Sequence, residues 1–198
     1  FRTRRGYHVA DGLDRRVEAT RQAMEFAHAL GAPIVTNHVG AVPADEAAPE
    51  WKLLADVLTD LALYSQRSGT VLCALTGTES GASLGKLLER LPKGLIGVTL
   101  DPGNLILSGF EPLEIVEAVG TEIRHVYADD AARDIVGLRP GVAARGATVM
   151  LGRGSVDYPA LLGALEERQY RGYLSVASSG TVDAATELSS AIKYLRSL

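Results

Sequence analysis

The most constraining feature of this sequence is a repeated alternation of short apolar runs with longer amphipathic segments. The apolar runs have the length and the β-branched content of buried strands. Five such runs begin near residues 33, 70, 96, 123 and 173. Helix-like segments separate them throughout. This order predicts βαβ units and a parallel sheet.

The same pattern gives bounds for the predicted elements. Strands are expected at Pro33–Val39, Thr70–Leu75, Ile96–Asp101, Ile123–Ala128 and Tyr173–Ala177. Helices, with apolar residues at steps of three and four, are expected at about Leu13–Leu30, Glu50–Arg67, Ser83–Leu91, Pro112–Val119, Tyr158–Arg168 and Ala184–Leu198. Gly31 and Gly69 lie just past the first two helices, where they provide stops.

The number of strands limits the architecture. A closed (β/α)8 TIM barrel has eight strands and typically about 250 residues, whereas this chain has 198 residues and five predicted strands. It is therefore either a complete open α/β sheet or a partial TIM barrel without its first three units. In the second case the first and last strands have unpaired edges, which favour association. Self-association, or a second chain over these edges, is the expected protein partner.

Composition places the chain among ordinary globular proteins. Hydrophobic residues make up 46% and charged residues 22% of the chain, so we expect a single domain over residues 1–198 with a sizeable core. Asp and Glu number 24 against 20 Lys and Arg, and no basic stripe is present. A nucleic-acid partner is therefore not expected. The single Cys73 excludes an internal disulfide and a thiolate zinc site.

The sequence contains neither a membrane-spanning run nor a signal-peptide pattern. Gly, Pro or charged residues interrupt every apolar run well before the roughly 18 residues that a membrane helix needs. The chain begins at Phe1, and no signal-peptide pattern follows it. We therefore expect a cytoplasmic protein with no membrane partner, either processed or truncated.

The candidate site lies where the predicted strands end, because parallel α/β folds bind ligands at the carboxyl ends of their strands. Asp101 closes an apolar strand and is followed by Pro-Gly-Asn. Its side chain either pairs with a ligand or caps the turn that follows. His125 and Tyr127 lie on one side of the next strand, and with Asp129 they form a polar row at its end.

Further polar residues follow the other strands. His38, after the first strand, and Asn104, after the third, are candidate ligand contacts. Glu79, in a Gly- and Ser-containing loop, either caps the next helix or faces a substrate. Arg153 lies in the stretch Gly152–Gly154, which either holds an anion through its backbone N–H groups or forms a plain turn.

Two further observations on the sequence give no support for a catalytic function. Asp129 and Asp130 beside Arg133 are typical of a solvated ion-pair cluster, which contributes little energy. The sequence contains no dinucleotide-binding, P-loop, zinc-protease or serine-hydrolase motif. Nucleotide-binding and serine-hydrolase functions therefore have no support.

Five segments together resemble a known family. They are Thr76–Gly81, Leu100–Leu105, His125–Asp130, Leu151–Pro159 and Gly172–Val176. Their order and spacing are similar to those of the xylose isomerase-like TIM-barrel superfamily, and most of all to its sugar phosphate isomerase/epimerase branch. The resemblance implies that the five strands match the fourth to eighth of the barrel and that this chain lacks the first three.

The resemblance also implies where a metal would bind. Members of the family hold Mn, Mg or Co through Glu, Asp, His and Glu at the ends of the last four strands. Those positions are Leu75, Asp101, Tyr127 and Ala177 here, and the usual Lys of the fourth-strand motif falls on Asp129. Leu75 and Ala177 offer no lone pairs, and a phenol is protonated at neutral pH. We therefore expect no cofactor, and a divalent metal only if other residues rebuild the site.

Two functions are consistent with these residues. The first is a metal-free binder of a small polar, carbohydrate-type ligand, or a pseudoenzyme, with His38, Asp101, Asn104, His125 and Tyr127 around the ligand. The second is a sugar isomerase or epimerase that works by metal-free acid/base chemistry. In that case Asp101 is the base and His125 or Tyr127 the acid. No motif identifies the substrate.

Overall fold

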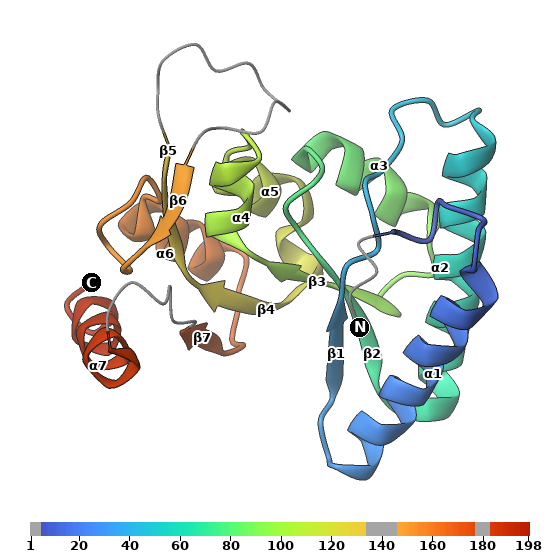
Figure 1. The fold of residues 1–198 in the computed structure, drawn as a ribbon, viewed down its shortest axis with the longest axis horizontal. Helices are drawn as coiled ribbons and strands as arrows, with labels where there is room; N and C mark the ends of the chain where they lie inside the picture. The colour runs from blue at the N-terminus through green and yellow to red at the C-terminus, as the bar shows by residue number, and fades with distance from the viewer. Residues whose placement is uncertain (1–4, 134–145, 177–182) are drawn as a thin grey trace. The chain divides into compact units, whose positions relative to one another are not determined.

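The protein is described here from a computed structural model that covers residues 5–133, 146–176 and 183–198 (Figure 1). Helices alternate with strands along most of the chain, as the sequence pattern predicts. The strands are β1 (Ile34–Asn37), β2 (Val71–Leu75), β3 (Ile96–Leu100), β4 (Ile123–Ala128), β5 (Asp130–Arg133), β6 (Gly146–Val149) and β7 (Leu174–Val176).

The first helix precedes these strands, the last follows them and the others lie between them. They are α1 (Leu13–Ala29), α2 (Pro49–Ser68), α3 (Gly81–Arg90), α4 (Pro102–Leu107), α5 (Pro112–Val119), α6 (Tyr158–Glu167) and α7 (Ala184–Leu195), with a 3-10 turn at Gly120–Glu122. Across the described residues, no helix is long and apolar enough to span a membrane.

Five parallel strands form one sheet in the order β1-β2-β3-β4-β7, which is the partial-barrel arrangement expected from the sequence. Ile34 pairs with Val71 at the start of the β1–β2 ladder. Tyr127 pairs with Ser175 in the β4–β7 ladder. Strands β1 and β7 end the sheet order within the described part of the chain. Association through their edges stays a prediction.

The chain divides into two compact units, and the first contains the described residues up to Leu75 together with Ala82–Val98. Its core is built around α2, whose apolar stripe Leu54, Leu58 and Leu61 is buried to within 1% exposure. The stripe belongs to a cluster with Met24 of α1 and Leu72 of β2. Helix α2 begins at a proline, which has no N–H to leave unsatisfied there, and is followed by Gly69 with a left-handed φ of 72°.

The second unit contains Thr76–Gly81 and the residues from Thr99 onward. Its core forms where α5 and α6 pack together, and it buries Ile115, Val116, Leu161 and Leu165. Residue Val126 of β4 is also fully buried. This unit carries most of the residues that the sequence singled out.

Two features of the second unit were not predicted. Helix α4 starts directly after Asp101, where the sequence indicated only a turn. Strands β5 and β6 pair antiparallel in a separate two-stranded sheet, with Asp130 opposite Val149. Neither segment has the length or the periodicity that identifies an element from sequence, since α4 has 6 residues and each strand has 4. The prediction of a single domain over residues 1–198 stays a prediction.

Candidate functional site

The turn after β3 is organised by Asp101. Its Oδ1 accepts a hydrogen bond from the Asn104 backbone N–H at 2.9 Å, which caps the first turn of α4. Its own N–H donates to Thr76 Oγ1 at 2.9 Å, and Asn104 Nδ2 donates to the Thr76 carbonyl at 3.1 Å. The capping role considered from the sequence is therefore present, and it leaves the second carboxylate oxygen outside the cap.

The carboxyl group of Asp129, which follows β4, lies against that of Asp101. Asp129 Oδ1 accepts the Gly103 N–H at 3.1 Å, two residues along the chain from Asp101. Burial, followed by the charge of Asp101, raises the pKa of Asp129 to about 8. The pair therefore holds one proton near neutral pH.

Gly103 makes this approach of the two carboxyl groups feasible. A Cβ at this position would lie 2.6 Å from Asp129 Oδ2, well inside contact distance. Gly77 has a similar role, because a Cβ there would lie 1.9 Å from Asn104 Nδ2 and its φ is +136°. Both glycines keep backbone close to the polar side chains at the ends of β2 and β3.

Asp130 corrects one expectation from the sequence. It is 1% exposed and is not part of a solvated cluster, and Arg133 pairs with Glu111 instead. Its carboxylate accepts four backbone N–H groups, from Ala131 (2.9 Å), Gly152 (3.1 Å), Gly154 (2.8 Å) and Val156 (3.2 Å). The Gly152–Gly154 stretch does hold an anion through its backbone, and that anion is the chain's own Asp130.

Tyr158 and Arg153 are two further residues of the second unit. Tyr158, at the start of α6, donates its hydroxyl to the Asp129 backbone carbonyl at 2.6 Å. Burial, with the nearby charges of Asp129 and Asp130, raises the pKa of this phenol, so it stays a donor. Arg153 is exposed, and it has no side-chain partner among the described residues. Its predicted ligand contact stays untested.

His125 and Tyr127 lie on one side of β4, as predicted. Both are partly buried while Val126 between them is fully buried. Their rings meet edge to face with centroids 4.9 Å apart, and His125 Nε2 lies 2.8 Å from Ser175 Oγ on β7. Burial lowers the pKa of His125, and among the residues that the structure describes its buried Nδ1 has no hydrogen-bond partner. His125 is therefore a neutral imidazole with one of its two ring nitrogens, Nε2, in a hydrogen bond.

Glu79, in the loop after β2, is 5% exposed. Its Oε2 accepts hydrogen bonds from the Thr78 backbone N–H (3.2 Å) and from the Thr78 hydroxyl (2.5 Å). Burial raises the pKa of this carboxyl, against the effect of the Thr78 hydrogen bonds. These hydrogen bonds do not test either role predicted for Glu79, which is to cap the next helix or to contact a substrate.

The residues present do not fit the metal set of the resembled family. Leu75 has a hydrocarbon side chain, and Asp101 is engaged with the Asn104 N–H and the Asp129 carboxyl. Tyr127 is a phenol, and Ala177 lies outside the described residues. Across the part of the chain that the structure describes, no three His, Cys, Asp or Glu residues are grouped so as to hold a metal ion. One carboxylate that already caps a helix is a poor site for a hard cation.

His38 belongs to the first unit, and the other candidates belong to the second. It is exposed and lines a cavity of about 690 Å³ between α1 and β1. That cavity also contains residues the sequence did not single out, among them Arg5, Arg15 and Arg16. Their signal was present in the sequence as a cluster of arginines before and at the start of the first helix.

Comparison with known proteins agrees with this fold. A family model described as xylose isomerase-like TIM barrel matches residues 7–198. Inosose dehydratase of Clostridium botulinum (strain Alaska E43 / Type E3) is 27% identical over 194 residues, which cover 85% of this chain and 65% of the relative. Inosose dehydratase of Clostridium perfringens (strain 13 / Type A) is 28% identical over 156 residues, covering 73% and 52%. The chain thus spans about half to two thirds of the length of these curated relatives.

Solved structures give the same picture. A xylose isomerase domain protein from Planctomyces limnophilus is 29% identical, with a TM-score of 0.86 over 97% of this chain and 67% of that one. A D-tagatose 3-epimerase-like protein is 21% identical, with a TM-score of 0.76 over 96% of this chain and 73% of that one. The second likeness shows the fold alone.

Proposed function

Because this chain belongs to the xylose isomerase-like TIM-barrel family, we propose that it moves a proton on a small polyhydroxylated, carbohydrate-type molecule. The paired carboxyl groups of Asp101 and Asp129 are the acid and the base. The observation that carries this proposal is the proximity of the two carboxyl groups at the ends of β3 and β4, where Asp129 accepts the Gly103 N–H next to the turn that Asp101 caps and where Asp101 raises the pKa of Asp129. Similarity to inosose dehydratases supports an enzyme that acts on a cyclic or open-chain polyol ketone.

The chemistry follows from the state of the pair. The ionised carboxylate removes a proton from the carbon next to a carbonyl group, and the protonated carboxyl group gives its proton to the carbonyl oxygen. The product is an enediol. Return of a proton to carbon gives an isomer or an epimer, and loss of a neighbouring hydroxyl group as water gives dehydration. Two adjacent carboxyl groups divide these roles because their proximity prevents both from ionising together.

The remaining polar side chains of the second unit have supporting roles in this proposal. Asn104 is fixed by the Thr76 carbonyl, and His125 is fixed by Ser175. The neutral imidazole and the phenol of Tyr127 are suited to hydrogen bonds with sugar hydroxyl groups. No step is assigned to a metal, because Leu75, Tyr127 and Ala177 do not supply the donors of the family set.

Proton exchange tests the proposal directly. The full chain, stripped of metals with a chelator, is incubated in D₂O with inosose and with a panel of ketoses and aldoses. We expect deuterium to enter the carbon next to the carbonyl of at least one compound. Asp101→Asn and Asp129→Asn should abolish the exchange, while Asp56→Asn, an exposed carboxylate on α2, should leave it unchanged. Exchange that needs added Mn²⁺, or no exchange with any compound, contradicts the proposal.

A second candidate is a metal-free binder without catalysis. One observation favours it: Asp101 Oδ1 already accepts the Asn104 N–H that caps α4, so only its other oxygen is left to act as a base. The same panel separates the two functions. Saturable binding of a sugar or polyol with no deuterium incorporation, and with no loss of binding in Asp129→Asn, would identify the binder.

A further inference from the structure

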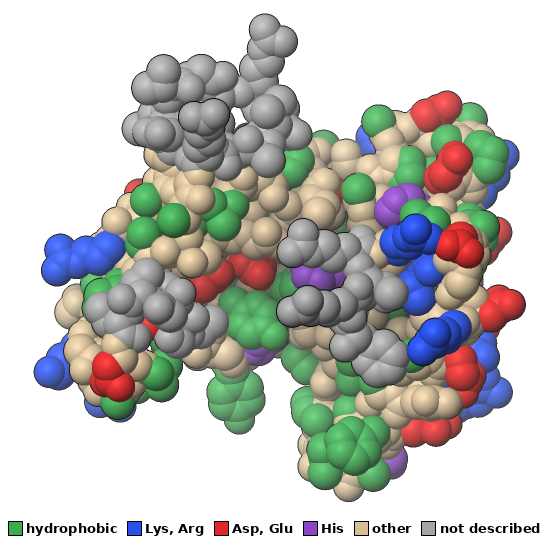
Figure 2. Space-filling view, in the orientation of Figure 1, with side chains coloured by type: hydrophobic (Ala, Val, Ile, Leu, Met, Phe, Trp, Pro, Cys, Tyr) green, Lys and Arg blue, Asp and Glu red, His purple; other side chains and the backbone are tan. Residues whose placement is uncertain are grey.

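One face of the last helix packs against the part of the second unit that carries Asp129 and Asp130. On α7, Ala191 and Tyr194 are three residues apart and therefore lie on the same face. Ala191 is 2% exposed, so this face packs against the rest of the unit. Charged and apolar side chains both lie on the surface of α7 that Figure 2 shows, and Ile192 is 44% exposed. Tyr194 therefore lies on the buried side of the helix, and Ile192 does not.

The ring of Tyr194 lies against the backbone of Gly152. A Cβ at this position would lie 2.8 Å from Tyr194 Cζ and 2.9 Å from its Cε2, so only glycine lets the ring approach this closely. Gly152 also has a φ of +78°, which L side chains rarely adopt. Burial, with the charges of Asp130 and Asp157, raises the pKa of the Tyr194 phenol. A neutral ring therefore covers the loop.

The loop that this ring covers is the one that holds Asp130. The Gly152 N–H donates to Asp130 Oδ2 at 3.1 Å, and the Gly154 N–H donates to the same oxygen at 2.8 Å. A Cβ at Gly154 would lie 2.1 Å from Asp130 Oδ1, so the loop and the carboxylate fit each other closely. The Tyr194 ring thus limits the movement of the loop whose N–H groups bind Asp130.

Tyr194 also contacts Tyr158, which holds the neighbouring residue Asp129. The two rings meet edge to face with centroids 6.1 Å apart, an arrangement that aromatic pairs prefer. Tyr158 is fully buried, and its hydroxyl donates to the Asp129 backbone carbonyl at 2.6 Å. One side chain of α7 therefore contacts both groups that hold the backbone at these two aspartates.

We propose that Tyr194 is a positioning residue for the carboxyl group of Asp129. Its ring restrains the loop and the phenol that hold the backbone of Asp129 and Asp130. The Asp129 carboxyl group in turn accepts the Gly103 N–H at 3.1 Å, which gives a measure of where it lies. The consequence for catalysis rests on the proposed function, whereas the consequence for the position of the carboxyl group does not.

Amide NMR of the full chain tests this position without any substrate. The Gly103 N–H reports on the Asp129 carboxyl group, and the Gly152 and Gly154 N–H groups report on the loop. Tyr194→Leu keeps an apolar side chain on α7 but removes the ring. We expect it to speed hydrogen exchange at Gly152 and Gly154 at least tenfold and to shift the Gly103 amide resonance. Tyr194→Phe keeps the ring and should match the wild-type chain at all three amides.

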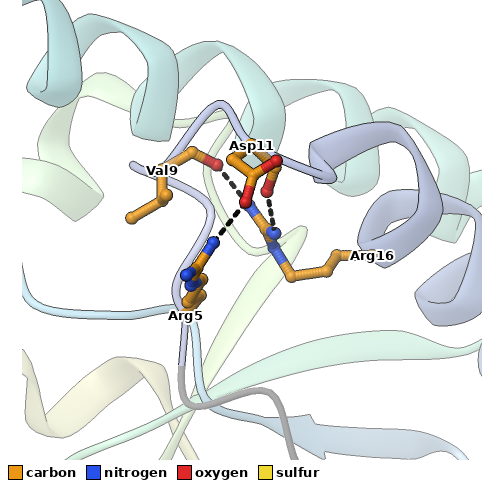
Figure 3. A network of polar contacts seen from close by, with 4 residues as sticks. All are labelled: Arg5, Val9, Asp11 and Arg16. Atoms are coloured by element: carbon orange, nitrogen blue, oxygen red, sulfur yellow. Dashed lines mark hydrogen bonds and ion pairs between the residues drawn. The ribbon is translucent and has the colours of Figure 1, made fainter.

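Two control variants separate this effect from a general loss of stability. Ile192→Ala shortens an exposed side chain of the same helix. Arg16→Gln removes hydrogen bonds to the Val9 and Asp11 carbonyls in the first unit, where Arg5 also pairs with Asp11 (Figure 3). We expect both controls to leave the three amides unchanged. Circular dichroism confirms that each variant folds.

Deuterium incorporation from D₂O measures the effect on catalysis, with a compound that the wild-type chain exchanges. We expect Tyr194→Leu to lower the kcat of exchange at least tenfold and to change KM less than threefold. The reason is that a displaced carboxyl group slows proton transfer more than it weakens binding. Tyr194→Phe should exchange at the wild-type rate, and so should Ile192→Ala.

The possible results have distinct meanings. Amides of Tyr194→Leu that match the wild-type chain overturn the proposal, as does a change that Ile192→Ala or Arg16→Gln reproduces. Changed amides with an unchanged kcat of exchange also overturn it, because Tyr194 would then have a structural role alone. Changed amides in Tyr194→Leu, with a wild-type chain that exchanges no compound, support the positioning of Asp129 and refute the proposed function alone.

Discussion

The proton that Asp129 keeps near neutral pH predicts a specific dependence of stability on pH. Asp129→Asn replaces a carboxyl group by a neutral group of the same shape, whose oxygen can still accept the Gly103 N–H and whose amide can donate to Asp101. The variant therefore mimics the protonated state of the pair. Its advantage over the wild-type chain should therefore grow with pH wherever Asp129 is ionised in the unfolded wild-type chain but still protonated in the folded one.

The sign and the size follow from the pKa of Asp129. It is raised in the folded chain from 3.8 to about 8, so the folded state holds a proton that the unfolded state releases. The contribution of Asp129 to the free energy of unfolding is therefore fully present below the pKa of the unfolded state. It is lost as the pH rises toward and through the pKa of the folded state. The loss is about 1.4 kcal/mol per pH unit, with a ceiling of about 6 kcal/mol for a difference of about four units.

Urea denaturation between pH 5 and pH 9 measures this effect. The free energy of unfolding of Asp129→Asn, minus that of the wild-type chain, should rise steadily with pH and level off above about pH 8. Asp56→Asn, which removes an exposed carboxylate, should show no such rise. A difference between Asp129→Asn and wild type that stays flat from pH 5 to pH 9 would refute the reasoning about the pair.

Two further substitutions test the geometry around the site. Asp130→Ala leaves four backbone N–H groups without their acceptor, so we expect the free energy of unfolding to fall by about 3–5 kcal/mol. Hydrogen exchange measured by NMR should become faster at the Gly152 and Gly154 amides. Unchanged exchange at these two amides would contradict the assigned role. Gly77→Ala should cost about 2 kcal/mol, because its φ of +136° and a Cβ 1.9 Å from Asn104 Nδ2 force the turn to move; thermal unfolding that matches the wild-type chain would show that the turn adapts.

Much of the main sheet could be predicted from the sequence, because its elements are long enough to carry a period. The predicted and observed bounds of α5, Pro112–Val119, and of β4, Ile123–Ala128, agree to the residue. The positions of β1, β2 and β3 were predicted to within a few residues for the same reason. Apolar runs closed by Gly or Pro give a strong local signal.

The candidate site was predicted only in part. The position of Asp101 at a strand end follows from local sequence, but its contact with Asp129 joins residues that are far apart in the chain, and no local pattern reports such a contact. Asp130 was misinterpreted for a related reason. Its charge and its neighbour Arg133 indicate a surface pair, whereas the four N–H groups that make its burial favourable come from a distant loop and from its own strand.

The hydrogen bonds between Asp130 and the Gly152–Val156 loop have a practical consequence for engineering. The contacts are made to main-chain amides, so the loop keeps its path through atoms that every residue type except proline possesses. The exposed side chains of Arg153 and Ser155 take no part in those four bonds. Randomising these two positions would therefore yield a library of variants whose loop surface differs in charge and size while the loop backbone keeps the same path.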